Sequence, residues 1–144
     1  MKSTNVFLFS DDSAKLGDFN VSKVAKRGLG YIQKGSPYYA SPEIRKEKPY
    51  NNKSDLWSLG CVLYEMITLR LPFRAQNMEG LYNKVCKGQF SWIPDKFSED
   101  LSKIIQYLLQ VNPILRQSCE QILNHPIIKK QIKYFKSFSG DEDT

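Results

Sequence analysis

The sequence predicts an α+β fold that is mainly helical, with a small β-hairpin at its amino-terminal end. Two patterns predict this fold: short apolar runs near the amino terminus, and apolar residues at helical spacing from residue 54 onward. The chain has 144 residues, of which 41% are hydrophobic. That length and composition suit one globular domain.

The hairpin is expected within the first 18 residues. Residues 6–9 form an apolar run typical of a strand, and residues 14–16 are a second strand candidate. Between them, Asp11, Asp12 and Ser13 have side chains that favour a turn. Residues 19–43 are rich in glycine and proline and are predicted to form a long loop, which in a compact domain is usually functional.

Three helices are predicted in the middle of the chain. Apolar residues cover nearly the whole circumference of 54–69, which predicts a buried helix that Pro72 ends. Residues 77–87 show a weaker pattern, with Asn77 as a cap and Gly88 as a stop. Ser98 caps the third helix. Its apolar stripe consists of Leu101, Ile104, Ile105, Leu108 and Leu109.

A last short helix is expected from a capping box of Ser118 and Gln121 to about Asn124, with Pro126 following it. The domain is expected to cover residues 1–128. Residues 129–144 are basic and then acidic, and we expect this tail to be frayed.

Charge and cysteine content exclude several classes of protein. Lys and Arg number 21 against 15 Asp and Glu, so the net charge is +6. Such a charge is compatible with nucleic acid or an anionic membrane as partner, but no zinc-finger spacing or RNA-binding aromatic strand accompanies it, which disfavours nucleic acid. No apolar run approaches the roughly 20 residues of a membrane span. Three widely spaced cysteines without a CxxC motif favour a reducing, cytoplasmic location.

Three short motifs occur in a fixed order. Lys2 and Asn5 come first, Asp18-Phe19-Asn20 follows the second strand candidate, and Ser41-Pro42-Glu43 ends the long loop. This order resembles that of a protein kinase, which has the end of the catalytic loop, then DFG, then the activation segment, then APE. The resemblance implies the carboxy-terminal lobe of the protein kinase fold.

The resemblance also implies ATP and Mg²⁺ as cofactors. By the match, Asp18 holds the Mg²⁺ that bridges the ATP phosphates, Asn5 holds a second Mg²⁺, and Lys2 contacts the transferring phosphate. The residue types suit this chemistry, because Mg²⁺ prefers hard oxygen ligands and phosphoryl transfer depends on positioning and charge neutralisation.

Further residues match the kinase pattern. Glu43 and Arg116 correspond to a buried ion pair of the family, and Asp55 to a residue of the central helix that bonds backbone near the catalytic Asp. Ser36 and Tyr39 lie in the substrate-docking end of the activation segment. Ser36 either bonds the catalytic Asp or is a phosphorylation site, and both readings remain open.

Within the kinases, the chain resembles the NIMA-related (Nek) serine/threonine kinases. The segments that carry this resemblance are GSPYYASPE and YNNKSDLWSLGCVLYEMITLRLPF, and Asn20 in place of the DFG glycine looks like a ciliary branch. The resemblance covers residues 1–128. It implies a protein substrate, allows for a regulatory protein partner, and suggests association with the cytoskeleton or the cilium.

The sequence contains no HRD motif and no GxGxxG. We therefore expect a piece of a longer kinase that does not transfer phosphate alone, with an exposed apolar floor of the ATP cleft and an Asp55 carboxylate that faces water. One alternative is a truncated, non-catalytic module that binds partners through residues 35–43 and 77–87. Another alternative is a basic protein that binds nucleic acid or a membrane surface.

Overall fold

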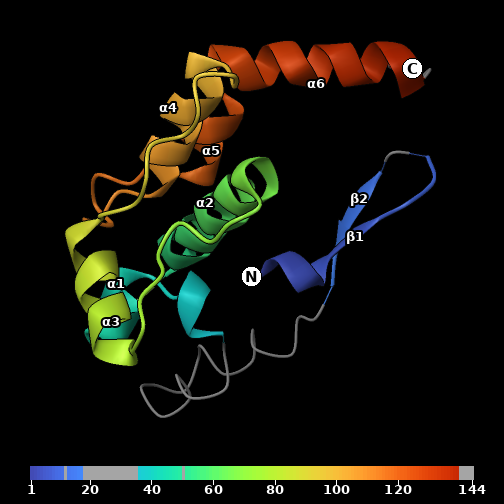
Figure 1. The fold of residues 1–144 in the computed structure, drawn as a ribbon. Helices are drawn as coiled ribbons and strands as arrows, with labels where there is room; N and C mark the ends of the chain where they lie inside the picture. The colour runs from blue at the N-terminus through green and yellow to red at the C-terminus, as the bar shows by residue number, and fades with distance from the viewer. Residues whose placement is uncertain (12, 18–35, 50, 140–144) are drawn as a thin grey trace.

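The computed structural model describes residues 1–11, 13–17, 36–49 and 51–139 (Figure 1). It contains one two-stranded sheet and a group of helices. The strands are β1 (Val6–Leu8) and β2 (Ala14–Leu16). The α-helices are α1 (Pro42–Arg45), α2 (Asn52–Thr68), α3 (Met78–Lys87), α4 (Glu99–Leu108), α5 (Cys119–Leu123) and α6 (Pro126–Ser139). Two 3₁₀ turns, η1 (Ser3–Asn5) and η5 (Pro37–Tyr39), complete the described elements.

The predicted hairpin is confirmed. β1 and β2 are antiparallel, and Phe7 pairs with Lys15 in the middle of the ladder. The backbone N–H of Ser13 donates to the Asp11 carboxylate at 3.0 Å, which is the turn chemistry that the sequence indicates. The hairpin stands apart from the helices, on the side of α2 away from α3 and α4 (Figure 1).

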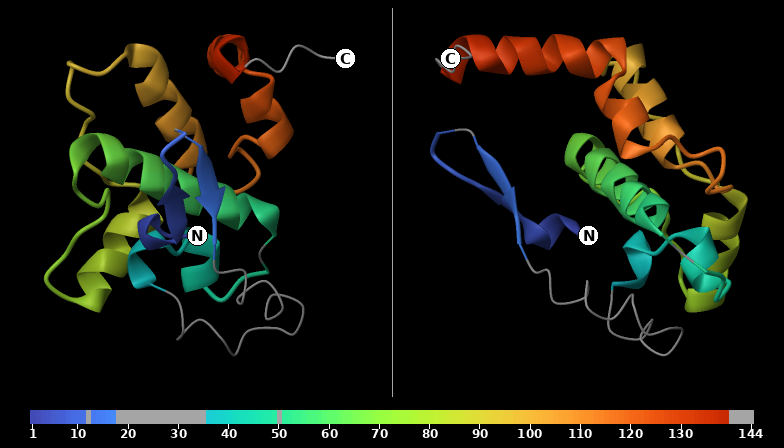
Figure 2. Two further views of the ribbon diagram at one scale, coloured as in Figure 1. Left: turned by 90° about the vertical axis from the view of Figure 1, so that its right-hand side faces the viewer. Right: turned by 180° about the vertical axis from the view of Figure 1, so that it is seen from behind.

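Helix α2 is the central element, against which α3, α4 and α5 pack, while most of α6 extends away from it (Figure 2). Trp57 and Cys61 on this helix are fully buried, and the Trp57 ring stacks on Phe73 with centroids 5.3 Å apart. The helix is therefore buried as predicted. It ends at Thr68 rather than at Pro72, because Leu69 adopts a left-handed conformation with φ of 57°.

The core has two adjoining clusters. The larger one joins α2 to α3 and to the segment before α4 through Trp57, Phe73, Leu81, Val85 and Ile93. The smaller one joins α2 to α4 and α5 through Leu56, Ile104, Leu108 and Ile122. Gly60 lies where α2 meets α4, since a Cβ atom placed on it would be 2.8 Å from the Leu108 Cβ.

The predicted helix caps are confirmed. Asn77 accepts a hydrogen bond from the Gly80 N–H at 2.8 Å, and Gly88 ends α3 with φ of 64°. Ser98 caps α4, and Ser118 with Gln121 forms the capping box of α5. Local chain signals thus determine where these helices begin and end.

The expectation of a frayed tail from residue 129 is wrong as far as Ser139, because α6 is helical throughout this stretch. Pro126 does not only follow the preceding helix. It opens α6, since the first turn of a helix does not require its missing N–H. No glycine or further proline interrupts the helix, and Ile128 packs against the smaller cluster.

Two further findings concern the cysteines and the possibility of a membrane-spanning helix. All three cysteines are free, and burial raises the pKa of the Cys61 thiol, which suits the small core residue that the sequence predicts. Across the described ranges, none of the helices has the length and apolar character that a bilayer crossing requires.

The close approach of α2 and α4 at Gly60 gives a first testable prediction. We expect Gly60→Ala to lower the free energy of unfolding by about 1–3 kcal/mol, because the added methyl group overlaps Leu108 and Leu109. Urea unfolding followed by circular dichroism measures the change. Gly80→Ala is the matched control, since its methyl group would meet atoms only at 3.1 Å and should cost less. Equal losses in the two variants would contradict this account of the helix contact.

Candidate active site

The hairpin places two of the predicted site residues. Lys2 precedes η1 in an extended conformation, and its carbonyl accepts a hydrogen bond from the Asn5 N–H at 3.0 Å. The Asn5 carbonyl in turn accepts from the Gly17 N–H at 2.8 Å. This bond brings Asn5 next to the residue that precedes Asp18, although the two are far apart in the sequence. Asp18 and Asn20 themselves lie outside the described residues.

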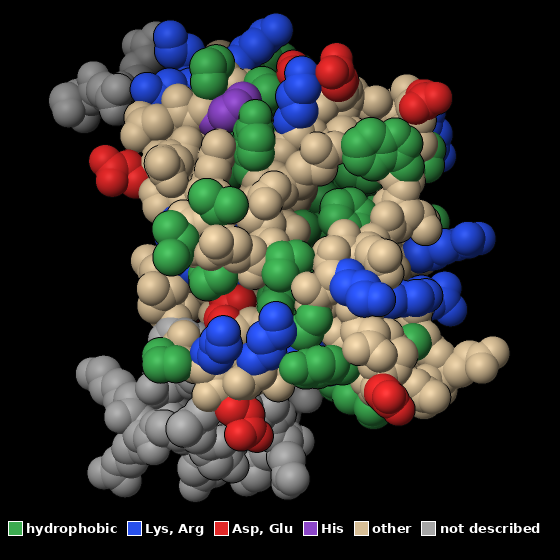
Figure 3. Space-filling view, turned by 90° about the vertical axis from the view of Figure 1, so that its left-hand side faces the viewer, with side chains coloured by type: hydrophobic (Ala, Val, Ile, Leu, Met, Phe, Trp, Pro, Cys, Tyr) green, Lys and Arg blue, Asp and Glu red, His purple; other side chains and the backbone are tan. Residues whose placement is uncertain are grey.

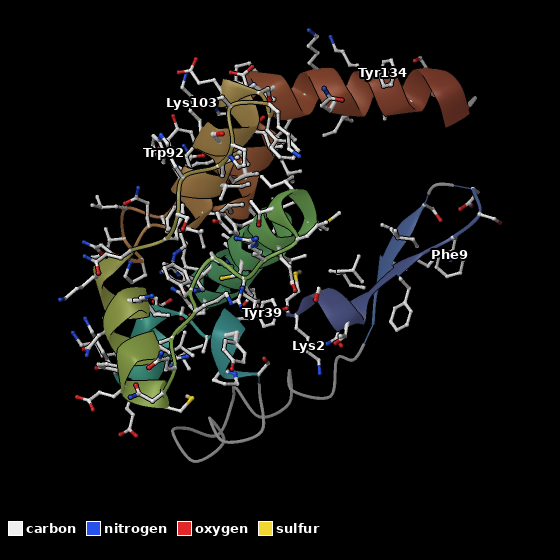
Figure 4. The ribbon with its side chains drawn as sticks, in the orientation of Figure 1. Lys2, Phe9, Tyr39, Trp92, Lys103 and Tyr134 are labelled. Carbon is white, nitrogen blue, oxygen red and sulfur yellow. The ribbon has the colours of Figure 1, made fainter. Side chains whose placement is uncertain are left out.

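Tyr39 joins the amino-terminal segment to the central helix. Its hydroxyl lies 3.0 Å from the Ser3 hydroxyl and donates to the Glu65 carboxylate at 2.6 Å, while the Ser58 hydroxyl donates to the Tyr39 carbonyl at 2.9 Å. Burial, together with the Glu65 carboxylate, raises the pKa of the Tyr39 phenol. Figure 4 shows Tyr39 between α2 and the segment that carries Lys2. The segment around Tyr39 and the amino-terminal segment around Ser3 are therefore held against α2 at one place.

Ser36 adjoins this network through its backbone, because its carbonyl accepts from the Tyr39 N–H at 3.4 Å, whereas the Asp55 side chain forms no hydrogen bond within the described residues. Ser36 is half-buried directly before η5, and its side chain does not cap that turn. Asp55 lies in the first turn of α2 and is exposed, so its carboxylate faces water, as expected. Neither position decides between the two readings of Ser36.

Glu43 and Arg116 meet in the interior. Two hydrogen bonds join the guanidinium to the carboxylate, at 2.7 and 3.1 Å, and the side chains are only 0% and 5% exposed. Arg116 also donates to the carbonyls of Lys53 at 2.6 Å and Gln110 at 3.0 Å. Its guanidinium carbon lies 5.1 Å from the Trp57 ring. The guanidinium thus meets four acceptor atoms in the interior, which offset the cost of burying its charge.

The surroundings of Glu43 determine its charge state. Burial alone would raise the pKa of this carboxyl, but the hydrogen bonds from Arg116 and Ser54 outweigh that effect and hold the pKa below its usual range. The Ser54 hydroxyl donates at 2.7 Å. Glu43 is therefore ionised at neutral pH despite its burial.

The hairpin exposes apolar side chains beside Asn5. Phe7, Leu8, Phe9 and Leu16 are between 48% and 73% exposed. The resemblance places the floor of an ATP cleft in this part of the chain, which stays a prediction. Apolar surface of this kind marks a place where another surface or ligand binds.

The residues predicted to bind metal have the chemistry of magnesium ligands. The Asn5 amide and the Asp18 carboxylate are oxygen donors, which suits Mg²⁺, and the Gly17 to Asn5 bond brings their chain segments together. Within the described ranges, no group of three His, Cys, Asp or Glu side chains could hold a metal ion. The donor set therefore fits Mg²⁺ only with Asp18 and with further oxygens from outside the described residues.

Sequence reasoning missed three residues of the site. Ser3 and Glu65 bind the Tyr39 hydroxyl, and Ser54 binds Glu43. Ser54 and Glu65 are polar residues within a helix that is otherwise apolar over most of its circumference. That contrast is a signal that each has a buried partner. Nothing in the sequence around Ser3 indicates its contact.

Comparison with known proteins identifies the family to which the chain belongs. The protein kinase domain matches residues 1–128, and the chain therefore belongs to the protein kinase family. The helical fold with its small hairpin is consistent with the carboxy-terminal lobe of that domain.

Three relatives show to which group of protein kinases the chain is similar. Human serine/threonine-protein kinase Nek5 is 44% identical over 135 residues, mouse Nek1 43% over 139 and human Nek2 40% over 130. These matches cover 92%, 95% and 89% of the chain. The predicted resemblance to the NIMA-related kinases is confirmed. The chain spans only 19%, 12% and 29% of these three relatives.

The buried ion pair gives a second prediction. We expect Arg116→Met to lower the free energy of unfolding by about 3–5 kcal/mol, because the Glu43 carboxylate stays buried without its partner. The matched control is Lys103→Met, which removes a surface ion pair with Glu99. The Lys103 Nζ lies 3.1 Å from the Glu99 carboxylate, and the side chains of Lys103 and Glu99 are 46% and 83% exposed. That change should cost under about 1 kcal/mol. Urea unfolding near neutral pH measures both losses.

The same variant has an expected pH dependence. The folded-state pKa of Glu43 lies below its unfolded value, so the pair stabilises the protein above the unfolded pKa and ceases to do so as pH falls through the folded pKa. In Arg116→Met the buried Glu43 loses its main partner and takes up a proton at a higher pH than in wild type, so the difference in stability should shrink as pH falls from neutral towards the lowered folded-state pKa of the paired Glu43. A difference that is constant into acid would show that charge is not its cause.

The hydroxyl of Tyr39 gives a third prediction. Tyr39→Phe should lower the free energy of unfolding by about 1–2 kcal/mol, because Glu65 and Ser3 lose a buried partner. Hydrogen exchange should become faster in residues 3–8, which Tyr39 anchors. Tyr38→Phe is the matched control, since that side chain is 38% exposed, and it should leave both quantities almost unchanged. Equal effects of the two variants would rule out the proposed anchoring.

Proposed function

We propose that this chain is the carboxy-terminal lobe of a serine/threonine protein kinase, which transfers the γ-phosphate of ATP to a hydroxyl of a protein substrate. The observation that carries the proposal is the backbone hydrogen bond from Gly17 to Asn5. It supports a shared metal site, because it brings the segments of Asn5 and Asp18 together. The names of the three relatives agree with this activity, since all three are serine/threonine-protein kinases.

Each residue has a role in this proposal. Asn5 and Asp18 would hold Mg²⁺, which neutralises charge on the ATP phosphates when it is bound. Lys2 contacts the transferring phosphate from the same segment. Tyr39 fixes the distance between that segment and the activation-segment end, where Ser36 lies. Glu43 and Arg116 hold that end against the helices. Positioning of this kind accounts for a large share of the rate of phosphoryl transfer.

The 144-residue chain alone is proposed to be inactive. Its sequence contains neither an HRD motif nor a GxGxxG, so the general base and most of the nucleotide site have to come from other residues. General-base assistance alone is typically worth about 10²–10⁴ in rate. The protein substrate, a regulatory protein partner and a cytoplasmic place near the cytoskeleton or cilium are proposed from the family resemblance.

A chimera tests the catalytic proposal. Residues 1–128 replace the matching segment of the human Nek5 kinase domain, whose remaining part supplies the HRD and glycine-rich segments. We expect the chimera to phosphorylate protein Ser or Thr with ATP and Mg²⁺. Asp18→Ala or Asn5→Ala should lower that rate by about 100-fold or more. Glu120→Gln on the exposed surface of α5 is the control and should retain activity.

Two results would contradict the proposal. One is a chimera that melts cooperatively but transfers no phosphate while the parent kinase does. The other is full activity in the Asp18→Ala variant. Phosphate transfer by the 144-residue chain alone would contradict only the proposed inactivity of the isolated lobe.

A second candidate function is that of a non-catalytic binding module. The exposed apolar side chains of the hairpin favour it, since Leu8 is 73% exposed and requires cover in a stable protein. The chimera separates the two functions: an active chimera supports the kinase, and a folded inactive one supports the module.

A further inference from the structure

Trp92 is an exposed aromatic side chain in a fixed position. It is 75% exposed, whereas Trp57, the other tryptophan, is fully buried. Its neighbour Ile93 is 5% exposed and belongs to the larger core cluster, which anchors the backbone at this point. A large aromatic ring that a rigid backbone presents to solvent is the usual anchor of a protein interface.

The ring borders a groove of about 370 Å³ between the 92–97 segment and α4. One wall is apolar and consists of Trp92, Pro94 and Phe97. The other is polar and comes from one face of α4, where Ser102, Lys103 and Gln106 follow each other at helical spacing. Figure 4 shows Trp92 and Lys103 close to α4 and far from Lys2. The groove is therefore separate from the candidate active site.

The groove has donor groups that its own residues do not use. Within the described part of the chain, the Trp92 indole N–H and the Gln106 side-chain amide form no hydrogen bond. The Ser102 hydroxyl has only a long one, at 3.4 Å to the Ser98 carbonyl. An apolar wall that faces free donors fits a ligand with apolar side chains and unsatisfied carbonyl groups. A polyproline II segment is such a ligand, since it has no internal hydrogen bonds.

The other backbone conformations fit less well. A helical ligand satisfies its own carbonyl groups and would leave the donors of α4 without partners. A β-strand would require a sheet edge, and the described sheet is the hairpin, which stands on the other side of α2 (Figure 1).

The charged residues around the groove add a second requirement for its ligand. Glu99 and Lys103 form an ion pair at 3.1 Å and compensate each other. Lys96 lies over the Phe97 ring at 5.1 Å. Asp95 lines the groove and forms no ion pair within the described ranges. Figure 3, which views the molecule from this side, shows apolar side chains at the surface among charges of both signs. A basic residue next to the prolines would complement Asp95.

We propose that the groove between Trp92 and α4 binds a proline-containing peptide segment of a protein partner, in polyproline II conformation and with a basic residue beside the prolines. The inference goes beyond phosphoryl transfer, because it concerns a surface remote from Lys2 and Asn5. It defines a docking site that could recruit a substrate or a regulator without contact with the reacting groups.

The 144-residue chain itself is suitable for the test. The probe is a synthetic peptide of roughly ten residues, about three turns of polyproline II, with PxxP spacing and a flanking arginine. We expect saturable binding with a blue shift of the tryptophan emission, since Trp92 leaves water while Trp57 is already buried. Calorimetry or the anisotropy of a labelled peptide gives the dissociation constant independently of tryptophan emission.

Variants of the chain and of the peptide identify the groove. Trp92→Ala should weaken binding by about 10-fold or more. Ile114→Ala is the matched control, because Ile114 is 85% exposed and lies outside the groove, and it should bind as wild type. Asp95→Asn should weaken binding of the arginine peptide only. A peptide with alanine in place of both prolines should bind at least about 10-fold more weakly.

Three results would overturn the proposal. The first is no saturable binding up to about 1 mM peptide by a chain that circular dichroism shows to be folded. The second is equal binding by wild type and Trp92→Ala. The third is self-association in sedimentation that Trp92→Ala abolishes, because the occupant of the groove would then be a second copy of the chain. None of these outcomes depends on the kinase activity proposed above.

Discussion

The buried ion pair of Glu43 and Arg116 connects two parts of the chain that are 73 residues apart. Arg116 uses its remaining donors on the backbone carbonyls of Lys53 and Gln110, at the start of α2 and after the end of α4. One side chain therefore fixes the position of α1, α2 and α4 relative to one another. A buried pair of this kind gives little net stability over an apolar one. We infer that it contributes specificity here, since this arrangement of the helices gives the guanidinium four acceptors at once.

The candidate site depends on that arrangement. Glu43 lies in the first turn of α1, and the chain just before that helix carries Tyr39, whose hydroxyl reaches both the amino-terminal segment and Glu65 of α2. If α1 moved relative to α2, the Tyr39 contacts would break, and the segment of Lys2 and Asn5 would lose its anchor. The ion pair and the site are thus two ends of one connected set of hydrogen bonds.

Much of the fold was predictable because its signals are local. Helix caps such as Asn77 and Ser98 involve residues a few positions apart, and the apolar pattern of α2 reports its burial directly. The missed features are tertiary. Leu69 ends α2 by adopting a left-handed conformation that its residue type does not favour, and α6 depends on Ile128 packing against residues from other helices. For the site, the order of motifs predicted which residues matter, but the contacts of Ser3 and Glu65 follow only from how the chain packs.

Helix α6 has a mechanical consequence. It contains 14 residues, which at about 1.5 Å each gives a rod of roughly 21 Å. Its first turns are anchored by Ile128, and the rest runs away from the helical core along the edge of the molecule (Figure 2). A segment joined to its far end would start from a defined point and direction instead of a flexible tether. The lobe would then set the volume that such a segment explores, and with it the local concentration at which the segment meets the domain's own surface.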